Sequence, residues 1–296
     1  MGSITIVWAA SVLLNVLGKL NLRSLALSPD GRRYLIKGSG RPVAMPFAVR
    51  WALPALCRDS PLRWRVCTDV HLVAVPVLMY LWLGPYASDE RLRVVGALLV
   101  CGLPGLWRIH IRWPVSVDAT ALAWALGSAL LVRNGQLVPG VLAAVFAGLV
   151  KETSPVFAAC FAWSPLPLAG LLAPAVVKCF ARVGPDPMGQ PDVLANPFLA
   201  SRLYHVGRWF DPRLMAAPWG ICLLAFGVTD RDLLVMLAVT AAVAYGQIVI
   251  ATDTVRLYQW AAPPVIAATI TVVPSRWAYA ALAAHLLNPW AGKAET

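Results

Sequence analysis

Long apolar runs recur along the whole chain, and they constrain its fold more than any other feature. A membrane span needs about 20 apolar residues to cross roughly 30 Å of hydrocarbon. Shorter runs are tolerated at membrane depth where they line protein or a watery cavity. The candidate runs are Ile4–Leu20, Thr68–Gly84, Val94–Trp107, Pro114–Val132, Leu137–Val150, Thr153–Phe180, Leu214–Val228, Leu233–Ile250, Gln259–Val273 and Trp277–Leu287.

This pattern predicts an all-α, polytopic membrane protein. We expect eight to ten transmembrane or half-spanning helices in a single domain, residues 1–296, because no linker is long enough to start a second domain. The longest run, Thr153–Phe180, is interrupted by Ser164-Pro165-Leu166-Pro167 and by Pro174. Proline breaks helices, so this run is expected to form a helical hairpin or a broken helix.

Composition excludes a soluble globule. Of the 296 residues, 59% are hydrophobic and only 13% are charged, so too much apolar surface would face water. The formal net charge of +11 lies on few residues, which makes anionic lipid head groups and lipid phosphates the expected partners. Nucleic acid is not an expected partner, because there is no separate basic domain. The six cysteines show neither a CxxC pair nor zinc-ligand spacing.

A basic loop follows the first apolar run. Residues 19–65 hold ten of the 25 Lys and Arg residues, against only Asp30 and Asp59. Within the loop, Pro46–Leu56 is mostly apolar, which predicts an interfacial helix with Trp51 at head-group depth. A second loop, Ala181–Arg213, interleaves basic and aromatic residues and is expected to form another interfacial element.

Further charged residues lie at or near the ends of apolar runs: Asp118, Lys151, Glu152, Asp253 and Arg256. Each has two interpretations. A helix cap or a local ion pair explains them structurally, whereas ionisable residues in membrane segments are costly and usually functional. The chain has no Walker A segment, HExxH motif or nucleophile elbow, which argues against soluble nucleotide chemistry.

Four short segments resemble the GT-C membrane glycosyltransferases, in particular the compact bacterial mannosyltransferase-like members that use polyprenyl-phosphate sugars. The first segment is the first loop, which runs from Asp30-Gly31 through Tyr34 and Arg41-Pro42 to PFAVRWALPAL. The other three segments are Trp113–Asp118, AGLVKETSP and TDTVRLYQWAAPP. In that family an acidic residue of the first external loop is the catalytic base. The resemblance gives this role to Asp30.

The chemistry of such a transfer suits the same residues. Asp30 would take the proton of the acceptor hydroxyl, and cations would stabilise the departing lipid phosphate. The expected substrate- and lipid-phosphate-binding residues are Arg41, Arg50, Asp118, Lys151, Glu152, Asp253 and Arg256. No metal or other cofactor is obligatory. We expect the donor to be a polyprenyl-phosphate sugar, the acceptor to be a lipid, glycan or protein, and the transfer to be inverting.

The site is expected on the non-cytoplasmic face of the plasma membrane. The positive-inside rule favours the opposite side for a basic loop, but these cations have a proposed anionic ligand. Two alternatives stay open: a lipid or small-molecule transporter or flippase, and a non-catalytic scaffold of the same fold. A transporter should hold its charges at mid-depth and show inverted repeats. Here the charges lie at run ends and no repeat is evident, which favours the enzyme.

Overall fold

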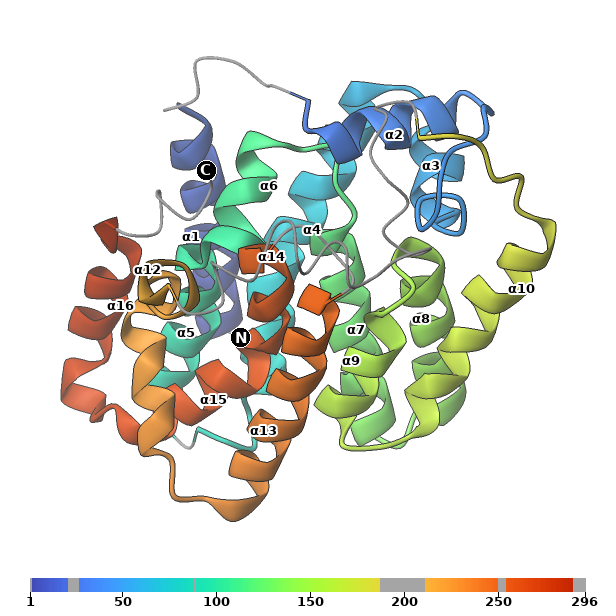
Figure 1. The fold of residues 1–296 in the computed structure, drawn as a ribbon. Coiled ribbons are helices and arrows are strands. Elements are labelled where there is room, and N and C mark those ends of the chain that lie inside the picture. Colours follow the sequence, from blue (N-terminus) through green and yellow to red (C-terminus); the bar gives the residue numbers. More distant parts are fainter. Residues whose placement is uncertain (1, 21–26, 88, 187–210, 250–253, 290–296) are drawn as a thin grey trace. The chain divides into compact units, whose positions relative to one another are not determined.

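The computed structural model describes residues 2–20, 27–87, 89–186, 211–249 and 254–289 (Figure 1). Within these ranges the chain is helical and forms no strand. An isolated parallel bridge joins Val43 to Val183. The predicted all-α class is therefore confirmed for the part of the chain described. The second predicted interfacial element, Ala181–Arg213, lies mostly outside these residues.

Two compact units make up the chain, and each combines segments that are distant in sequence. One consists of Met1–Gly18, Val73–Ile109 and Pro197–Thr296. The other consists of Lys19–Leu72 and His110–Asn196, and we call it the loop unit because it contains the basic first loop. The prediction of a single domain stays a prediction.

The loop unit is built around five packed helical segments. They are α7 (Asp118–Arg133), α8 (Leu137–Val150), α9 (Ser154–Ala162), η3 (Leu166–Leu171) and α10 (Leu172–Phe180). Helix α7 packs against α8 and α9, and α8 packs against η3 and α10 (Figure 1). Small residues let α8 and η3 approach closely. A Cβ atom on Gly170 would lie only 2.5 Å from the carbonyl oxygen of Ala144.

The predicted break in Thr153–Phe180 is confirmed. Helix α9 ends at Ala162, and the backbone of the next residue, Trp163, is left-handed (φ 54°, ψ 43°). Pro165 precedes the next helical segment, η3, and Pro167 lies in its first turn. Since α9 and η3 pack against each other, the run forms a helical hairpin.

The first loop folds into two short helices. Helix α2 (Pro29–Gly38) begins after Ser28, whose Oγ accepts a hydrogen bond from the Gly31 N–H, and Pro29 occupies the first turn. Helix α3 spans Ala52–Cys57, so it covers only the second half of the predicted interfacial helix. Residues 46–49 form turns instead. Trp51, just before α3, is 54% exposed.

The other unit contains most of α1 (Gly2–Leu20) and a set of short, interrupted helices. They are α5 (Glu90–Leu99), η1 (Val100–Gly102), η2 (Pro104–Arg108), α12 (Pro212–Met215), η5 (Ala217–Gly227), α13 (Arg231–Gly246), η6 (Gln247–Val249), α14 (Thr254–Tyr258), η7 (Gln259–Ala261), α15 (Ala262–Val272), η8 (Ser275–Trp277) and α16 (Ala278–Leu286). Helix α15 packs against η5 and α13, and α16 packs against α5. Three helices, α1, α4 (Pro61–Trp82) and α6 (Ile109–Arg112), each have residues in both units.

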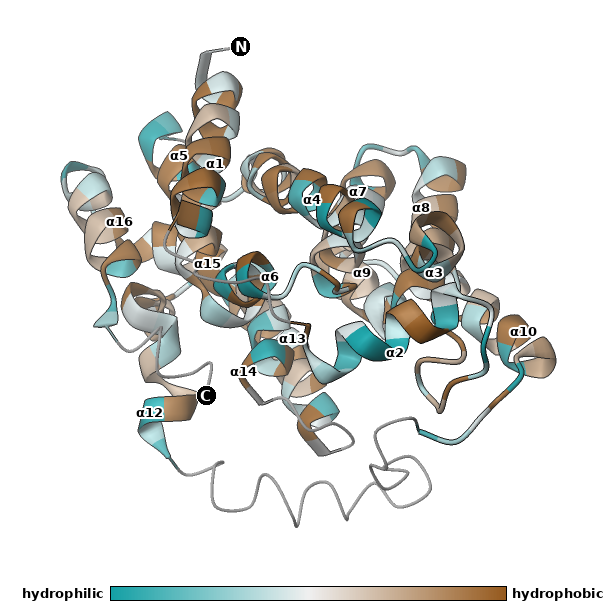
Figure 2. Ribbon diagram, turned by 90° about the horizontal axis from the view of Figure 1, so that it is seen from above, coloured by the Kyte–Doolittle hydropathy of each residue, from teal (hydrophilic) through white to brown (hydrophobic). Residues whose placement is uncertain are grey.

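Two described helices, α1 and α4, are long and apolar enough to cross a membrane. Two bent pairs raise this to four if each is one span: Glu90–Gly102 with Pro104–Arg112, bent by 67°, and Val255–Val272 with Ser275–Leu286, bent by 114°. Figure 2 shows hydrophobic residues along α1 and α10. Large apolar side chains such as Trp8 and Phe180 are exposed on these helices, as expected for surfaces that face lipid.

Candidate functional site

The N-terminal turn of α2 carries Asp30, and one turn later the same helix carries Arg33. The Nη1 of Arg33 donates to Asp30 Oδ1 over 3.1 Å. The other side of the guanidinium binds Asp186 through two hydrogen bonds, Nε to Oδ1 at 3.0 Å and Nη2 to Oδ2 at 2.7 Å. The Arg33 side chain is 3% exposed. A buried arginine therefore bridges two carboxylates that lie far apart in the sequence.

Arg50 connects the first loop to the turn after α8. Its Nε and Nη2 atoms donate to the two carboxylate oxygens of Glu152, both over 2.8 Å. The third donor, Nη1, binds the Tyr34 hydroxyl at 2.7 Å. Burial opposes ionisation of Glu152, but the charge and hydrogen bonds of Arg50 outweigh it and hold the pKa of Glu152 below its usual value. The backbone N–H of Trp51 donates to the Leu149 carbonyl, which holds the loop at this end of α8.

Asp118 and Lys151 form a second ion pair at the same end of the helices. The Lys151 ammonium donates to Asp118 Oδ1, and both side chains are almost completely buried. Asp118 is the first residue of α7, and Lys151 directly follows α8. Such a pair is costly to break, because removing one member takes away the opposite charge beside a buried ion.

Tyr34 lies among these pairs. It is buried, stacks on Trp64 with ring centroids 5.3 Å apart, and meets the edge of Phe47. Burial raises the pKa of Tyr34, and the charges of Arg50, Asp30 and Asp118 all act on its hydroxyl. We call the surrounding residues the charge cluster: Asp30, Arg33, Arg50, Asp118, Lys151, Glu152 and Asp186. Its four carboxylates outnumber its three cations by one.

The structure brings together most of the residues expected from the sequence. Five of them belong to the charge cluster: Asp30, Arg50, Asp118, Lys151 and Glu152. Arg41 lines a neighbouring cleft. Arg256 lies on α14, which belongs to the other compact unit, and Asp253 lies outside the described residues.

Sequence reasoning missed two members of the cluster. Arg33 follows Asp30 at the i,i+3 spacing of a helical ion pair, so recognising α2 would have found it. Asp186 carries no comparable signal, because 153 residues separate it from Arg33.

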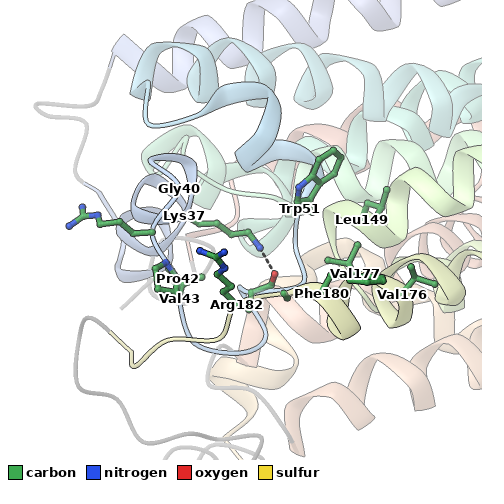
Figure 3. Close-up of a pocket in the computed structure, with 13 residues that line it drawn as sticks. Lys37, Gly40, Pro42, Val43, Trp51, Leu149, Val176, Val177, Phe180 and Arg182 are labelled. Atoms are coloured by element: carbon green, nitrogen blue, oxygen red, sulfur yellow. Dashed lines mark hydrogen bonds between the residues drawn. The ribbon is translucent and has the colours of Figure 1, made fainter.

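A cleft of about 640 Å³ opens beside the first loop (Figure 3). Its lining includes Lys37 from α2 and Arg182 from the segment after α10. Figure 3 shows both cationic side chains near one end of the cleft and Trp51, Leu149, Val176 and Val177 at the other. The described residues contain no group of three or more His, Cys, Asp or Glu side chains placed to hold a metal ion.

Comparison with known proteins leaves the site to be interpreted from its own geometry. No family model, curated protein or solved structure matches the chain.

Proposed function

We propose that this protein is a membrane glycosyltransferase that moves a sugar from a polyprenyl-phosphate donor to a lipid, glycan or protein acceptor. The proposal includes a polytopic frame of eight to ten membrane helices, with the site on the non-cytoplasmic face of the plasma membrane. The observation that carries it is the position of Asp30, which belongs to a buried cluster of charges while a quarter of its own side chain stays exposed.

Asp30 is suited to act as the base. Arg33 holds its Oδ1 by a hydrogen bond, and a quarter of the side chain is exposed, where an acceptor can approach. Glu152 is a weaker candidate, since Arg50 binds both of its oxygens. In the transfer, Asp30 takes the proton of the acceptor hydroxyl while the acceptor oxygen attacks the anomeric carbon. The bond from that carbon to the phosphate oxygen breaks, and its electron pair leaves with the lipid phosphate.

The cations divide into two groups in this proposal. Arg50 and Lys151 already bind carboxylates, so in this proposal they hold the shape of the site and do not contact the phosphate directly. Arg41 is exposed and is the predicted cation best placed to reach a phosphate directly. Phosphate contacts from Arg256, and any role of Asp253, stay predictions from the sequence.

Replacing Asp30 tests the proposal. Asp30→Asn keeps the side-chain volume and removes the proton acceptor, so transfer of radiolabelled sugar from a panel of polyprenyl-phosphate donors in membranes should fall by at least 100-fold. Asp59→Asn is the matched control, because Asp59 is the exposed second acid of the same loop, and it should transfer like the wild type. Full activity in Asp30→Asn would rule out Asp30 as the base.

A non-catalytic scaffold is the second candidate, and one observation favours it. The cluster neutralises Arg50 and Lys151 internally, as a purely structural network would. A scaffold predicts that wild-type membranes transfer no sugar from any donor of the panel and that cluster variants change only stability. The transporter has no comparable support among the described residues.

A further inference from the structure

The cleft beside the first loop has a cationic end without acidic residues. Its 13 lining residues include Lys37, Arg41 and Arg182 but no Asp or Glu. Within the part of the chain described, none of these three cations forms an ion pair with a carboxylate. A concave site lined by cations of this kind favours an anionic ligand.

The cationic end is held in place by the backbone around it. The Lys37 ammonium donates to the carbonyls of Phe47, at 2.9 Å, and Ala48. These two bonds leave one of its three donors for a ligand. On the opposite wall, the Val43–Val183 bridge and a 3.2 Å hydrogen bond from the Gly184 N–H to the Val43 carbonyl fix the segment that carries Arg182. Figure 3 shows the Lys37 and Arg182 side chains near each other.

The other end of the cleft is apolar and continues onto the surface of α10. Leu149, Val176 and Val177 line it, and Val176 and Phe180 are exposed large apolar residues. Trp51 borders the same end and suits the depth of lipid head groups. A cationic end joined to an apolar strip matches a molecule with an anionic head and a hydrocarbon chain.

We propose that this cleft binds an anionic phospholipid of the surrounding bilayer, with its phosphate between Lys37 and Arg182 and one acyl chain along Val176, Val177 and Phe180. The bound lipid is not the sugar donor, because no carboxylate lines the cleft to take a proton from an acceptor. The inference therefore does not depend on glycosyl transfer. It assigns the first loop a second role, in which a lipid fastens α2 to α10.

Native mass spectrometry of the delipidated full-length protein tests the proposal. Short-chain phosphatidylglycerol should bind at least tenfold more tightly than phosphatidylcholine with the same chains. Lys37→Met and Arg182→Met should each weaken phosphatidylglycerol binding about tenfold, the effect of losing one charge-assisted hydrogen bond. Lys178→Met is the matched control, because Lys178 is exposed on α10 but does not line the cleft, and its binding should match the wild type.

A second pair of variants probes the apolar end. Val176→Trp should block the cleft and abolish binding, whereas Leu172→Trp, also exposed on α10 but outside the lining, should leave it unchanged. Asp30→Asn should also bind normally, which separates this site from the proposed catalytic one. Equal binding of the two phospholipids would overturn the proposal. So would an equal loss in Lys178→Met, tighter binding of farnesyl phosphate than of phosphatidylglycerol, or complete competition by inorganic phosphate.

Discussion

At the scale of single residues, Lys37 shows how the position of a lysine in the fold changes the pKa of its side chain. Burial, followed by the nearby charge of Arg50, lowers the pKa of Lys37 from 10.5 to about 8. Lys37 therefore loses its proton in the folded protein at a pH where the unfolded chain still keeps it.

This difference in pKa makes the free energy of unfolding depend on pH in alkaline solution. Between pH 8 and pH 10.5 the unfolded chain binds more protons at Lys37, so its contribution makes the free energy of unfolding rise with pH. Lys37→Met should remove that rise. Thermal unfolding of the delipidated protein in detergent, compared between wild type and variant across this window, measures it. Parallel curves for the two proteins would contradict the assigned pKa.

The contribution of the buried Asp118–Lys151 pair to stability is measured by mutation. Lys151→Met removes the cation from this buried ion pair and should lower the free energy of unfolding by about 3–5 kcal/mol. Adding Asp118→Asn should recover part of that loss. Arg65→Met is the control, because the 4.0 Å pair of Arg65 with Asp69 is partly exposed and should contribute less than about 1 kcal/mol. Denaturant unfolding in mild detergent measures these variants and Asp118→Asn alone. Strictly additive losses from Lys151→Met and Asp118→Asn would show that the pair is not coupled.

At the scale of elements, the close approach of α8 and η3 depends on glycine. A Cβ atom on Gly170 would meet the Ala144 carbonyl oxygen, which cannot move aside as a side chain can. Gly170→Ala should therefore destabilise the protein by about 1–3 kcal/mol. Gly127→Ala is the matched control, since a Cβ there meets nothing within 4 Å inside α7, and it should be neutral or stabilising by up to about 1 kcal/mol. Equal effects of the two changes would contradict this packing.

The elements also show how far the sequence predicts the fold. The prolines correctly predicted the hairpin between α9 and η3. Proline lacks a backbone N–H and therefore interrupts a helix at its own position, whatever the rest of the fold. The same local chemistry at Ser28 and Pro29 starts α2, which we did not predict because its charged sequence lacks an apolar run. The predicted helix over Pro46–Leu56 was too long, since its first half forms turns that supply the carbonyls bound by Lys37.

The candidate site was predictable only in part. Asp30, Arg50, Asp118, Lys151 and Glu152 stood out as charges beside apolar runs, and the structure gathers them in one cluster. Their partners were not predictable, because Arg50 and Glu152 are 102 residues apart and pairing depends on how the helices pack.

At the scale of the whole molecule, the arrangement in the membrane is the main prediction. We expect the first loop and the α14 segment to face the outside of the cell. Cysteines at Ser39 and Thr254, introduced one at a time after all six native cysteines are replaced by Ser, should both react with a membrane-impermeant maleimide added to intact cells. Reaction only after the membrane is permeabilised would place the loop inside, as the positive-inside rule alone predicts.

The central claim is glycosyl transfer from a lipid phosphate, and product stoichiometry tests it most directly. Purified wild-type protein, supplied with polyprenyl-phosphate sugars and a detergent extract of membrane acceptors in a chelating buffer, should release lipid phosphate and glycosylated acceptor in equal amounts. Asp30→Asn should release neither above background. No release of lipid phosphate by the wild type with any donor, while the protein remains folded, would contradict the claim and leave the charge cluster as a structural network.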